Sequence, residues 1–234
     1  MSRIVLITGG TSGYGLETAK LFRENGDTVI IASRNEEKVE RIVKENGFAG
    51  GYTLDVTKYE QWAKLKEEIT KDFGAVDVLV NNAGGGVKLV NTVEQTKESI
   101  DEAISLNLTS SIYSSQLFAP GMIEKKDGVI INISSICARH QWGTWTIYGA
   151  AKAGLLSFSK GLYTELRPHG IRVTCILPGR ASTGFQSNSG IEECEETMSA
   201  RDIANAVLYC ANQPKGVVVE EITVWGTSQD VQPL

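Results

Sequence analysis

Short apolar runs alternate with longer amphipathic segments along most of this 234-residue chain, and this alternation limits the folds that it can adopt. Each apolar run has the length and the β-branched composition of a strand, and the segments between the runs have helical periodicity. Near-continuous apolar strands that alternate with helices are typical of parallel sheets covered on both faces. The sequence therefore predicts an α/β fold, with a doubly wound parallel sheet of about seven strands and helices on both faces.

The expected elements follow one another along most of the chain, and no low-complexity linker separates them. Strands are predicted at residues 3–8, 28–33, 51–54, 76–80, 128–134, 171–177 and 217–224. Helices are predicted at residues 14–25, 35–46, 58–73, 94–124, 147–167 and 200–212. Because no internal repeat or low-complexity segment interrupts this pattern, residues 1–234 are expected to form one domain.

The first predicted strand runs directly into a glycine-rich turn, Thr8-Gly-Gly-Thr-Ser-Gly-Tyr-Gly15, which leads into an amphipathic helical pattern. Glycines allow the backbone to approach a phosphate closely, and the amino terminus of a helix attracts negative charge. The spacing differs from Gly-x-Gly-x-x-Gly, because Thr18 stands where the third glycine would be. The segment is therefore either a pyrophosphate-binding turn or an ordinary tight turn.

A second constellation follows the fifth predicted strand. Tyr148 and Lys152 stand four residues apart in Tyr-Gly-Ala-Ala-Lys, and Ser135 precedes them at the end of that strand. Residues four apart share a helix face, and a lysine ammonium beside a phenol lowers a tyrosine pKa that is ordinarily near 10. Three such groups can surround one carbonyl, although a Tyr-x-x-x-Lys pair by itself also occurs on solvated helix faces.

The composition and net charge of the chain give no sign of a nucleic-acid-binding, membrane or metal-binding protein. Hydrophobic residues make up 41% of the chain and its net charge is −5, so nothing indicates binding to nucleic acid or membrane. No apolar run approaches the roughly 20 residues that span a bilayer, and Met-Ser-Arg leads into the first strand without a visible signal peptide. The four cysteines, Cys137, Cys175, Cys194 and Cys210, form no Cys-x-x-Cys pair. We therefore expect a cytoplasmic protein with reduced thiols and no metal.

The order of these segments resembles the short-chain dehydrogenase/reductase family, and the resemblance covers nearly the whole chain. It rests on the glycine turn, Asp55 in Leu-Asp-Val, Asn81-Asn82-Ala83-Gly84, Asn107 in Leu-Asn-Leu, Ser134-Ser135, the Tyr148–Lys152 pair, and Pro178-Gly179 with Thr183. The resemblance implies a single-domain Rossmann-type fold. It also implies reversible hydride transfer between a nicotinamide cofactor and a carbonyl or alcohol carbon.

Residue roles follow from the same resemblance. Tyr148 is expected to move the proton, Ser135 to hold the substrate oxygen, Lys152 to lower the tyrosine pKa and hold the nicotinamide ribose, and Asn107 to position a water. Each of two residues, taken alone, also has a purely structural interpretation: Asn107 as a residue that distorts a helix, and Ser135 as a helix cap. The expected cofactor contacts are Gly9, Thr11, Ser12, Gly13, Tyr14, Gly15, Ser33, Arg34, Asp55, Val56, Asn82, Ala83, Gly84, Tyr148, Lys152, Pro178, Gly179, Ala181 and Thr183.

The end of the second predicted strand favours NADP(H) over NAD(H). An acidic residue there would bond the adenosine ribose and repel a 2′-phosphate, but this chain has Ser33 followed by Arg34. A guanidinium suits a phosphate, and serine removes the repulsion. The alternative is an ordinary surface arginine. Ser12 also stands where many NADP-preferring relatives have a second basic residue.

The sequence gives less information about the residues that contact the substrate than about those that contact the cofactor. The family draws its substrate contacts from three segments, which here offer Gly86, Cys137, Trp142, Trp145 and Phe185, with a substrate loop at about residues 184–199. We expect the two tryptophans to line either the substrate pocket or a subunit contact. His140 is expected to be a satisfied polar residue, and the alternative is that it acts as a second acid. The carboxyl-terminal sequence, a valine-rich strand followed by Thr-Ser-Gln, resembles the 3-hydroxy acid and serine dehydrogenase branch. That resemblance suggests small polar alcohols or aldehydes.

The leading hypothesis is an NADP(H)-dependent carbonyl reductase or alcohol dehydrogenase. A 3-oxoacyl thioester reductase and a non-catalytic NADP(H)-sensing module remain as alternatives. The family also implies a homodimer or homotetramer, assembled through the helices predicted at 94–124 and 147–167. No nucleic-acid or membrane partner is expected.

Overall fold

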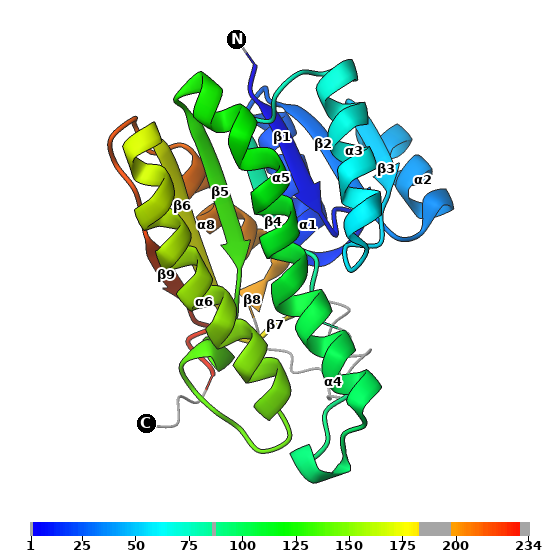
Figure 1. The fold of residues 1–234 in the computed structure, drawn as a ribbon, viewed down its shortest axis with the longest axis vertical. Coiled ribbons are helices and arrows are strands. Elements are labelled where there is room, and N and C mark those ends of the chain that lie inside the picture. The colour runs from blue at the N-terminus through cyan, green and yellow to red at the C-terminus, as the bar shows by residue number, and fades with distance from the viewer. Residues whose placement is uncertain (1, 86–87, 183–197, 230–234) are drawn as a thin grey trace.

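Seven parallel strands form the central sheet of the protein, in the order β3-β2-β1-β4-β5-β6-β9 (Figure 1). The computed structural model describes residues 2–85, 88–182 and 198–229. The strands are β1 (Ile4–Thr8), β2 (Thr28–Ser33), β3 (Gly50–Thr53), β4 (Val78–Asn81), β5 (Gly128–Ile133), β6 (Ile171–Pro178) and β9 (Glu221–Val224). The order reverses between β1 and β4, which confirms the predicted doubly wound sheet.

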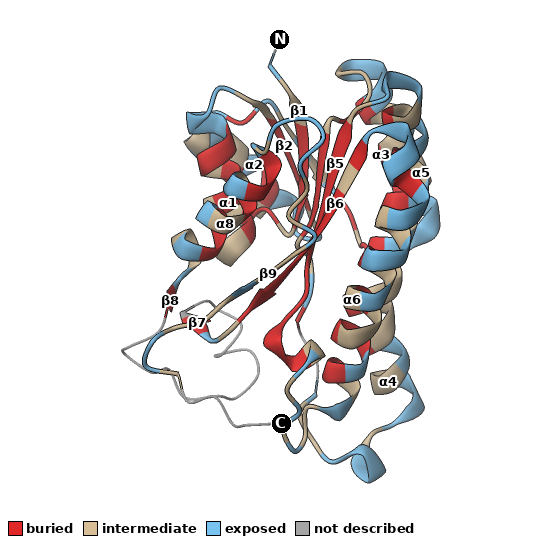
Figure 2. Ribbon diagram, turned by 90° about the vertical axis from the view of Figure 1, so that its left-hand side faces the viewer, coloured by how far each residue is buried: buried red, intermediate tan, exposed pale blue. Residues whose placement is uncertain are grey.

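Helices cover both faces of the sheet: α1, α2 and α8 lie on one face, and α3, α5 and α6 lie on the other (Figure 2). Their bounds are α1 Gly13–Glu24, α2 Glu36–Asn46, α3 Tyr59–Asp72, α4 Lys97–Ile104, α5 Ser110–Lys125, α6 Thr146–Leu166 and α8 Ala200–Ala211. Within the described ranges, none of these helices combines the length and the apolar character that crossing a membrane requires.

Alternate residues of each strand enter the two halves of the core. In β1, Val5 and Ile7 pack toward α1 and α8, whereas Leu6 packs toward α3 and α5. All three side chains are fully buried. Successive side chains of a strand point to opposite faces, so a sheet covered on both sides needs apolar residues at every position. This requirement explains the continuous apolar runs from which the strands were predicted.

The structure differs from the sequence-based expectation at one predicted helix, one predicted strand and two additional short strands. The helix predicted at 94–124 is divided, because α4 begins at Lys97 and a π-helical turn at Ser105–Thr109 separates it from α5. The strand predicted at 217–224 begins only at Glu221, where pairing with Cys175 of β6 starts. Two short strands, β7 (Ala181–Ser182) and β8 (Met198–Ser199), were not predicted, and β8 occupies the last residues of the expected substrate loop.

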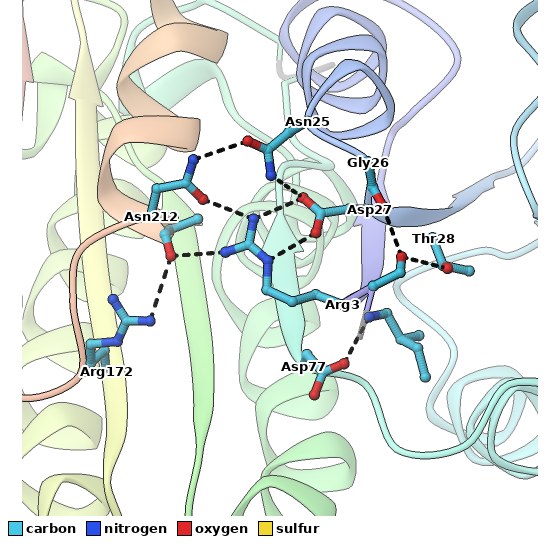
Figure 3. A network of polar contacts seen from close by, with 11 residues as sticks. Arg3, Asn25, Gly26, Asp27, Thr28, Asp77, Arg172 and Asn212 are labelled. Carbon is cyan, nitrogen blue, oxygen red and sulfur yellow. Dashed lines mark hydrogen bonds and ion pairs between the residues drawn. The ribbon is translucent and has the colours of Figure 1, made fainter.

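A polar network closes the end of the sheet at which the strands begin (Figure 3). The Arg3 guanidinium donates two hydrogen bonds to the Asp27 carboxylate, at 2.9 and 2.7 Å, and one each to the carbonyl of Ala211 and the side chain of Asn212. Asp27 is almost fully buried, so its charge depends on this partner. The network therefore ties the start of β1 to the ends of α1 and α8.

We predict that Arg3→Met lowers the free energy of unfolding by about 2 kcal/mol, because it leaves the Asp27 carboxylate without its cation. Urea denaturation monitored by circular dichroism measures this change. The matched control is Arg41→Met, which breaks an exposed pair with Glu45 in α2, and it should cost less than about 0.5 kcal/mol. Equal losses in the two variants would contradict the importance of the Arg3 network.

Candidate functional site

The carboxyl ends of β1 and β4 are joined by side-chain hydrogen bonds at the point where the strand order reverses. The Thr8 hydroxyl accepts from the backbone N–H groups of Asn82 and Ala83, both at 3.0 Å. The Asn82 side-chain amide donates back to the Thr8 carbonyl at 2.8 Å. Ligands of open α/β sheets bind at this position. Three of the expected cofactor residues, Asn82, Ala83 and Gly84, therefore lie directly beside the glycine turn.

The glycine turn has room for no side chain where it meets β4. A Cβ added at Gly15 would overlap the Gly9 carbonyl and approach the Asn82 amide to 2.5 Å. Gly9 and Gly13 have positive φ values of 65° and 52°. Glycine is thus required here by contact and by conformation, which favours a specialised binding turn over an ordinary one.

Helix α1 leaves its amino-terminal N–H groups available to an anion. Ser12 occupies the N-cap position in an extended conformation, but its side chain makes no capping hydrogen bond, and no acidic residue stands in the first turn. The first N–H groups of a helix lack partners within the helix and carry the positive end of its dipole. The turn and this helix end together fit a pyrophosphate group.

The other end of the expected cofactor site lies beyond β2. The Thr11 hydroxyl donates to the Ser33 hydroxyl at 3.2 Å, so two small polar groups stand together there. Arg34 is exposed beside them. Burial acts to raise the pKa of Asp55, but hydrogen bonds from Thr57 and the positive charges of Lys58 and Arg34 outweigh it and lower the pKa. Arg34 therefore lies close enough to Asp55 to act on its charge, at the end of the sheet where both were expected to contact the cofactor.

Tyr148 and Lys152 are buried on one face of α6, one helical turn apart. Lys152 Nζ donates to the carbonyl of Ile133, the last residue of β5, at 2.9 Å. The same nitrogen lies 5.6 Å from the centroid of the Tyr148 ring. Burial lowers the pKa of Lys152 to about 8, because the low-dielectric surroundings disfavour the charged form. This arrangement excludes the solvated-face interpretation of the pair.

Ser135 contacts the phenol from the end of β5. Its hydroxyl oxygen accepts from the Cys137 N–H at 3.1 Å, capping a short 3-10 helix, and it also shares a hydrogen bond with the Tyr148 hydroxyl. Burial raises the pKa of Tyr148 above its ordinary value, the Cys137 thiol adds to this shift, and the Ser135 hydrogen bond opposes it. The sequence-based expectation was a pKa lowered by Lys152, whereas burial dominates in the structure.

Asn107 sits in the π-helical turn between α4 and α5. Its side-chain oxygen accepts from the Gly85 N–H at 2.8 Å, and its amide donates to the Ala103 carbonyl at 3.0 Å. A Cβ added at Gly84 would lie 3.0 Å from the Asn107 oxygen and 3.1 Å from Lys152 Nζ. Gly84 therefore lies between Asn107 and Lys152. Single π-helical turns occur often at functional sites, which agrees with this placement.

A chain of buried hydrogen bonds connects these helices to the sheet. Ser114 of α5 donates to Asn81 at 2.6 Å, Asn81 donates to Asn132 of β5 at 2.8 Å, and Asn132 donates to Ser159 of α6 at 2.9 Å. Sequence reasoning missed Ser114, Asn132 and Ser159. The available signal was a single asparagine in the otherwise apolar run Val-Ile-Ile-Asn-Ile, since a buried polar residue needs partners.

The loop after β6 reaches the same edge of the sheet. The Gly179 N–H donates to the Val224 carbonyl at 2.7 Å, beyond the last paired residue of β6, Pro178. Ala181 is buried in a small apolar cluster with Met198 and Ile203, and Tyr14 of the glycine turn packs against that cluster. Thr183, also expected to contact the cofactor, lies outside the described residues.

Of the expected substrate residues, two lie beside Ser135 and Tyr148 in the structure. Cys137 is buried beside Ser135, and the Trp145 ring meets the Tyr148 ring edge to face, with centroids 5.6 Å apart. Trp142 instead contacts His140, whose ring also lies 5.5 Å from Trp225, a neighbour that sequence reasoning missed. The buried Nδ1 of His140 has no hydrogen-bond partner within the described ranges, contrary to expectation. Gly86 and Phe185 lie outside those ranges.

Comparisons with known proteins identify the family to which the chain belongs. The family model described as short chain dehydrogenase matches residues 3–193. An uncharacterized oxidoreductase of Staphylococcus aureus is 34% identical over 224 residues, covering 95% of this chain and 96% of the relative. Serine 3-dehydrogenase of Rhizobium radiobacter is 33% identical over 239 residues, covering 98% of this chain and 96% of the relative.

A solved structure described as the closed form of serine dehydrogenase complexed with NADP+ superimposes with a TM-score of 0.90. Its sequence is 26% identical, and the match covers 99% of this chain and 98% of that one. The matched range of the family model and the two sequence relatives extend over the glycine turn, the β4 segment and the Tyr148–Lys152 pair. The chain therefore belongs to the short-chain dehydrogenase family of oxidoreductases.

Proposed function

We propose that the chain transfers a hydride between NADP(H) and a carbonyl or alcohol carbon, as an NADP(H)-dependent reductase or dehydrogenase. The observation that carries this proposal is the burial of Tyr148 and Lys152 on one face of α6, with Ser135 bonded to the phenol. A bound nicotinamide cofactor supplies the hydride, and the protein supplies orientation and proton transfer. The whole chain acts as one catalytic domain, with its substrate loop at about residues 184–199.

Each catalytic side chain has a task that its surroundings support. The raised pKa keeps Tyr148 protonated at neutral pH, so the phenol can donate a proton to the substrate oxygen during reduction. Ser135, already in contact with the phenol, holds that oxygen as negative charge develops. Lys152, with a pKa of about 8, is mostly cationic at neutral pH and favours the phenolate that remains. Asn107, fixed by Gly85 and Ala103, positions a water that returns the proton.

The preference for NADP(H) rests on the end of β2. Ser33 and Thr11 present hydroxyl groups where a carboxylate would repel a phosphate, and Arg34 places an exposed guanidinium beside them. The NADP+ named in the similar serine dehydrogenase structure supports the same choice. The serine 3-dehydrogenase relative and the Thr-Ser-Gln tail favour a small polar alcohol or aldehyde as substrate.

We predict that Tyr148→Phe lowers kcat by roughly 10²- to 10⁴-fold, because it removes the proton donor while keeping the ring. NADPH oxidation against a panel of small aldehydes, ketones and keto acids measures the effect, and NADPH binding should persist. Tyr163→Phe, on the same helix, is the matched control and should retain activity. Unchanged turnover in Tyr148→Phe would contradict the assignment. A wild-type protein that binds NADPH tightly without turnover would favour a sensing module.

We predict that Arg34→Gln raises the KM for NADPH by roughly ten- to a hundredfold and leaves the KM for NADH within about twofold. The reason is the loss of a charge-assisted bond to the 2′-phosphate, a group that NADH lacks. Steady-state kinetics with both cofactors test this. Arg41→Gln on the exposed face of α2 serves as control. An equal loss with both cofactors would show that Arg34 does not discriminate between them.

We predict that Lys152→Met abolishes activity yet raises the free energy of unfolding at pH 7 by about 2 kcal/mol. Burial lowers the folded-state pKa of Lys152 from 10.5 to about 8. Below pH 8 the lysine is charged in both states, and the folded state bears the full cost of burying that charge. Between pH 8 and 10.5 the unfolded state binds more protons, so wild-type stability rises with pH relative to the variant.

The advantage of the variant should therefore be largest below pH 8 and shrink toward pH 10. Chemical denaturation at pH 6.5 and at pH 9.5 (values on either side of the folded-state pKa of about 8) measures it. A stability difference that is the same at both pH values would contradict a buried charge at this position.

A further inference from the structure

We propose that Gln229 is a positioning residue that fixes the loop after β6, residues 178–182, and so sets the affinity for the nicotinamide half of the cofactor. The proposal rests on the proposed function and on the family resemblance, in which the segment that corresponds to Pro178-Gly179 holds the nicotinamide amide. Gln229 lies in the segment that follows β9 and is the last residue of the Thr-Ser-Gln sequence, to which the sequence analysis assigned no role in the site.

One side chain joins the segment after β9 to the loop backbone. The Gln229 side-chain oxygen accepts a hydrogen bond from the backbone N–H of Arg180 at 2.6 Å. The backbone N–H of Gln229 donates to the Gly226 carbonyl at 3.0 Å, which folds the segment back toward β6. Gln229 itself is half-buried. A turn thus holds the glutamine where its amide oxygen meets the loop.

The Gln229 side-chain oxygen also lies close to the backbone of Gly179. A Cβ added at Gly179 would lie 2.5 Å from the Gln229 side-chain oxygen and 3.2 Å from the Val224 carbonyl. The Gly179 N–H donates to that same carbonyl at 2.7 Å. The glutamine oxygen and the end of β9 therefore cover the loop backbone on one side, and a side chain at position 179 would have to displace the Gln229 oxygen.

The following residues of the loop are held from a different direction. Ala181 and Ser182 form β7, which pairs with β8, and Ala181 is buried against Met198 and Ile203. Gln229 holds residue 180 and β8 holds residue 181, so the loop is fixed at two neighbouring points by two different elements. Loss of the Gln229 contact leaves the first part of the loop attached through Gly179 and Val224 alone on that side.

The effect of Gln229 should be confined to one half of the cofactor. The loop follows β6, whereas Ser33 and Arg34 follow β2, and three strands lie between β2 and β6 in the sheet. A disturbance of residues 178–182 therefore reaches the nicotinamide end without reaching the 2′-phosphate end. Adenosine 2′,5′-bisphosphate carries the 2′-phosphate but lacks the nicotinamide. Its binding therefore reports on the 2′-phosphate end alone.

The test uses three variants of the full chain and two ligands. Gln229→Met removes the acceptor oxygen with little change in side-chain length, and Gln229→Glu keeps an oxygen acceptor. Gln213→Met is the matched control. Gln213 follows α8 at the opposite end of the sheet, and its side-chain amide donates to the carbonyl of Tyr209 within that helix. Dissociation constants for NADPH and for adenosine 2′,5′-bisphosphate are measured by calorimetry, with a thermal melt of each variant.

We expect Gln229→Met to weaken NADPH binding by about three- to tenfold, the effect of one lost hydrogen bond, with bisphosphate binding within about twofold of wild type. Gln229→Glu and Gln213→Met should bind both ligands as the wild type does. Unchanged NADPH binding in Gln229→Met, or an equal loss for both ligands, would overturn the role of Gln229. A wild-type protein that binds neither ligand would instead overturn the proposed function, and this inference with it.

Discussion

The hydrogen bonds between Thr8 and Asn82 join the two strands at which the winding of the sheet reverses, and the rest of the site depends on this junction. A parallel sheet alone would leave a gap between β1 and β4, since their helices depart to opposite faces. The Thr8 hydroxyl and the Asn82 amide fix both strand ends with groups that would otherwise be unsatisfied. Gly9 and Gly15 can then approach Asn82 closely, and the glycine turn takes its shape from that contact.

The burial of Lys152 is the least favourable feature of the fold, and the surrounding polar groups make it tolerable. A buried ammonium loses much of its hydration, and the Ile133 carbonyl replaces only part of it. The chain of hydrogen bonds from Ser114 through Asn81 and Asn132 to Ser159 fixes α5 and α6 against the sheet. These bonds oppose a movement of the helices, and the buried lysine nitrogen lies 5.6 Å from the centroid of the Tyr148 ring.

Local patterns in the sequence were sufficient for most of the fold but for only part of the site. Continuous apolar runs identify the strands because both faces of the sheet are covered, and the glycine turn and the Tyr-x-x-x-Lys pair are short enough to be recognised in place. The π-helical turn at Ser105–Thr109 was not predicted, and the Asn107 side chain within it accepts a hydrogen bond from Gly85, which is 22 residues away in the sequence. The pKa of Tyr148 was expected to fall, since the spacing reveals Lys152 but does not reveal how deeply the phenol is buried.

The two ends of the proposed cofactor site differ in how much of each can be predicted from the sequence. The end at Ser33 and Arg34 is built from consecutive residues and one nearby hydroxyl, Thr11, so its chemistry can be deduced from a short stretch of sequence. The end at Gly179 is built from the loop after β6 and from a segment that follows β9, an edge strand with β6 as its one neighbour in the sheet. An edge strand is held by fewer backbone bonds than a central one. Side-chain contacts such as that of Gln229 therefore carry more of the positioning at this end than at the other.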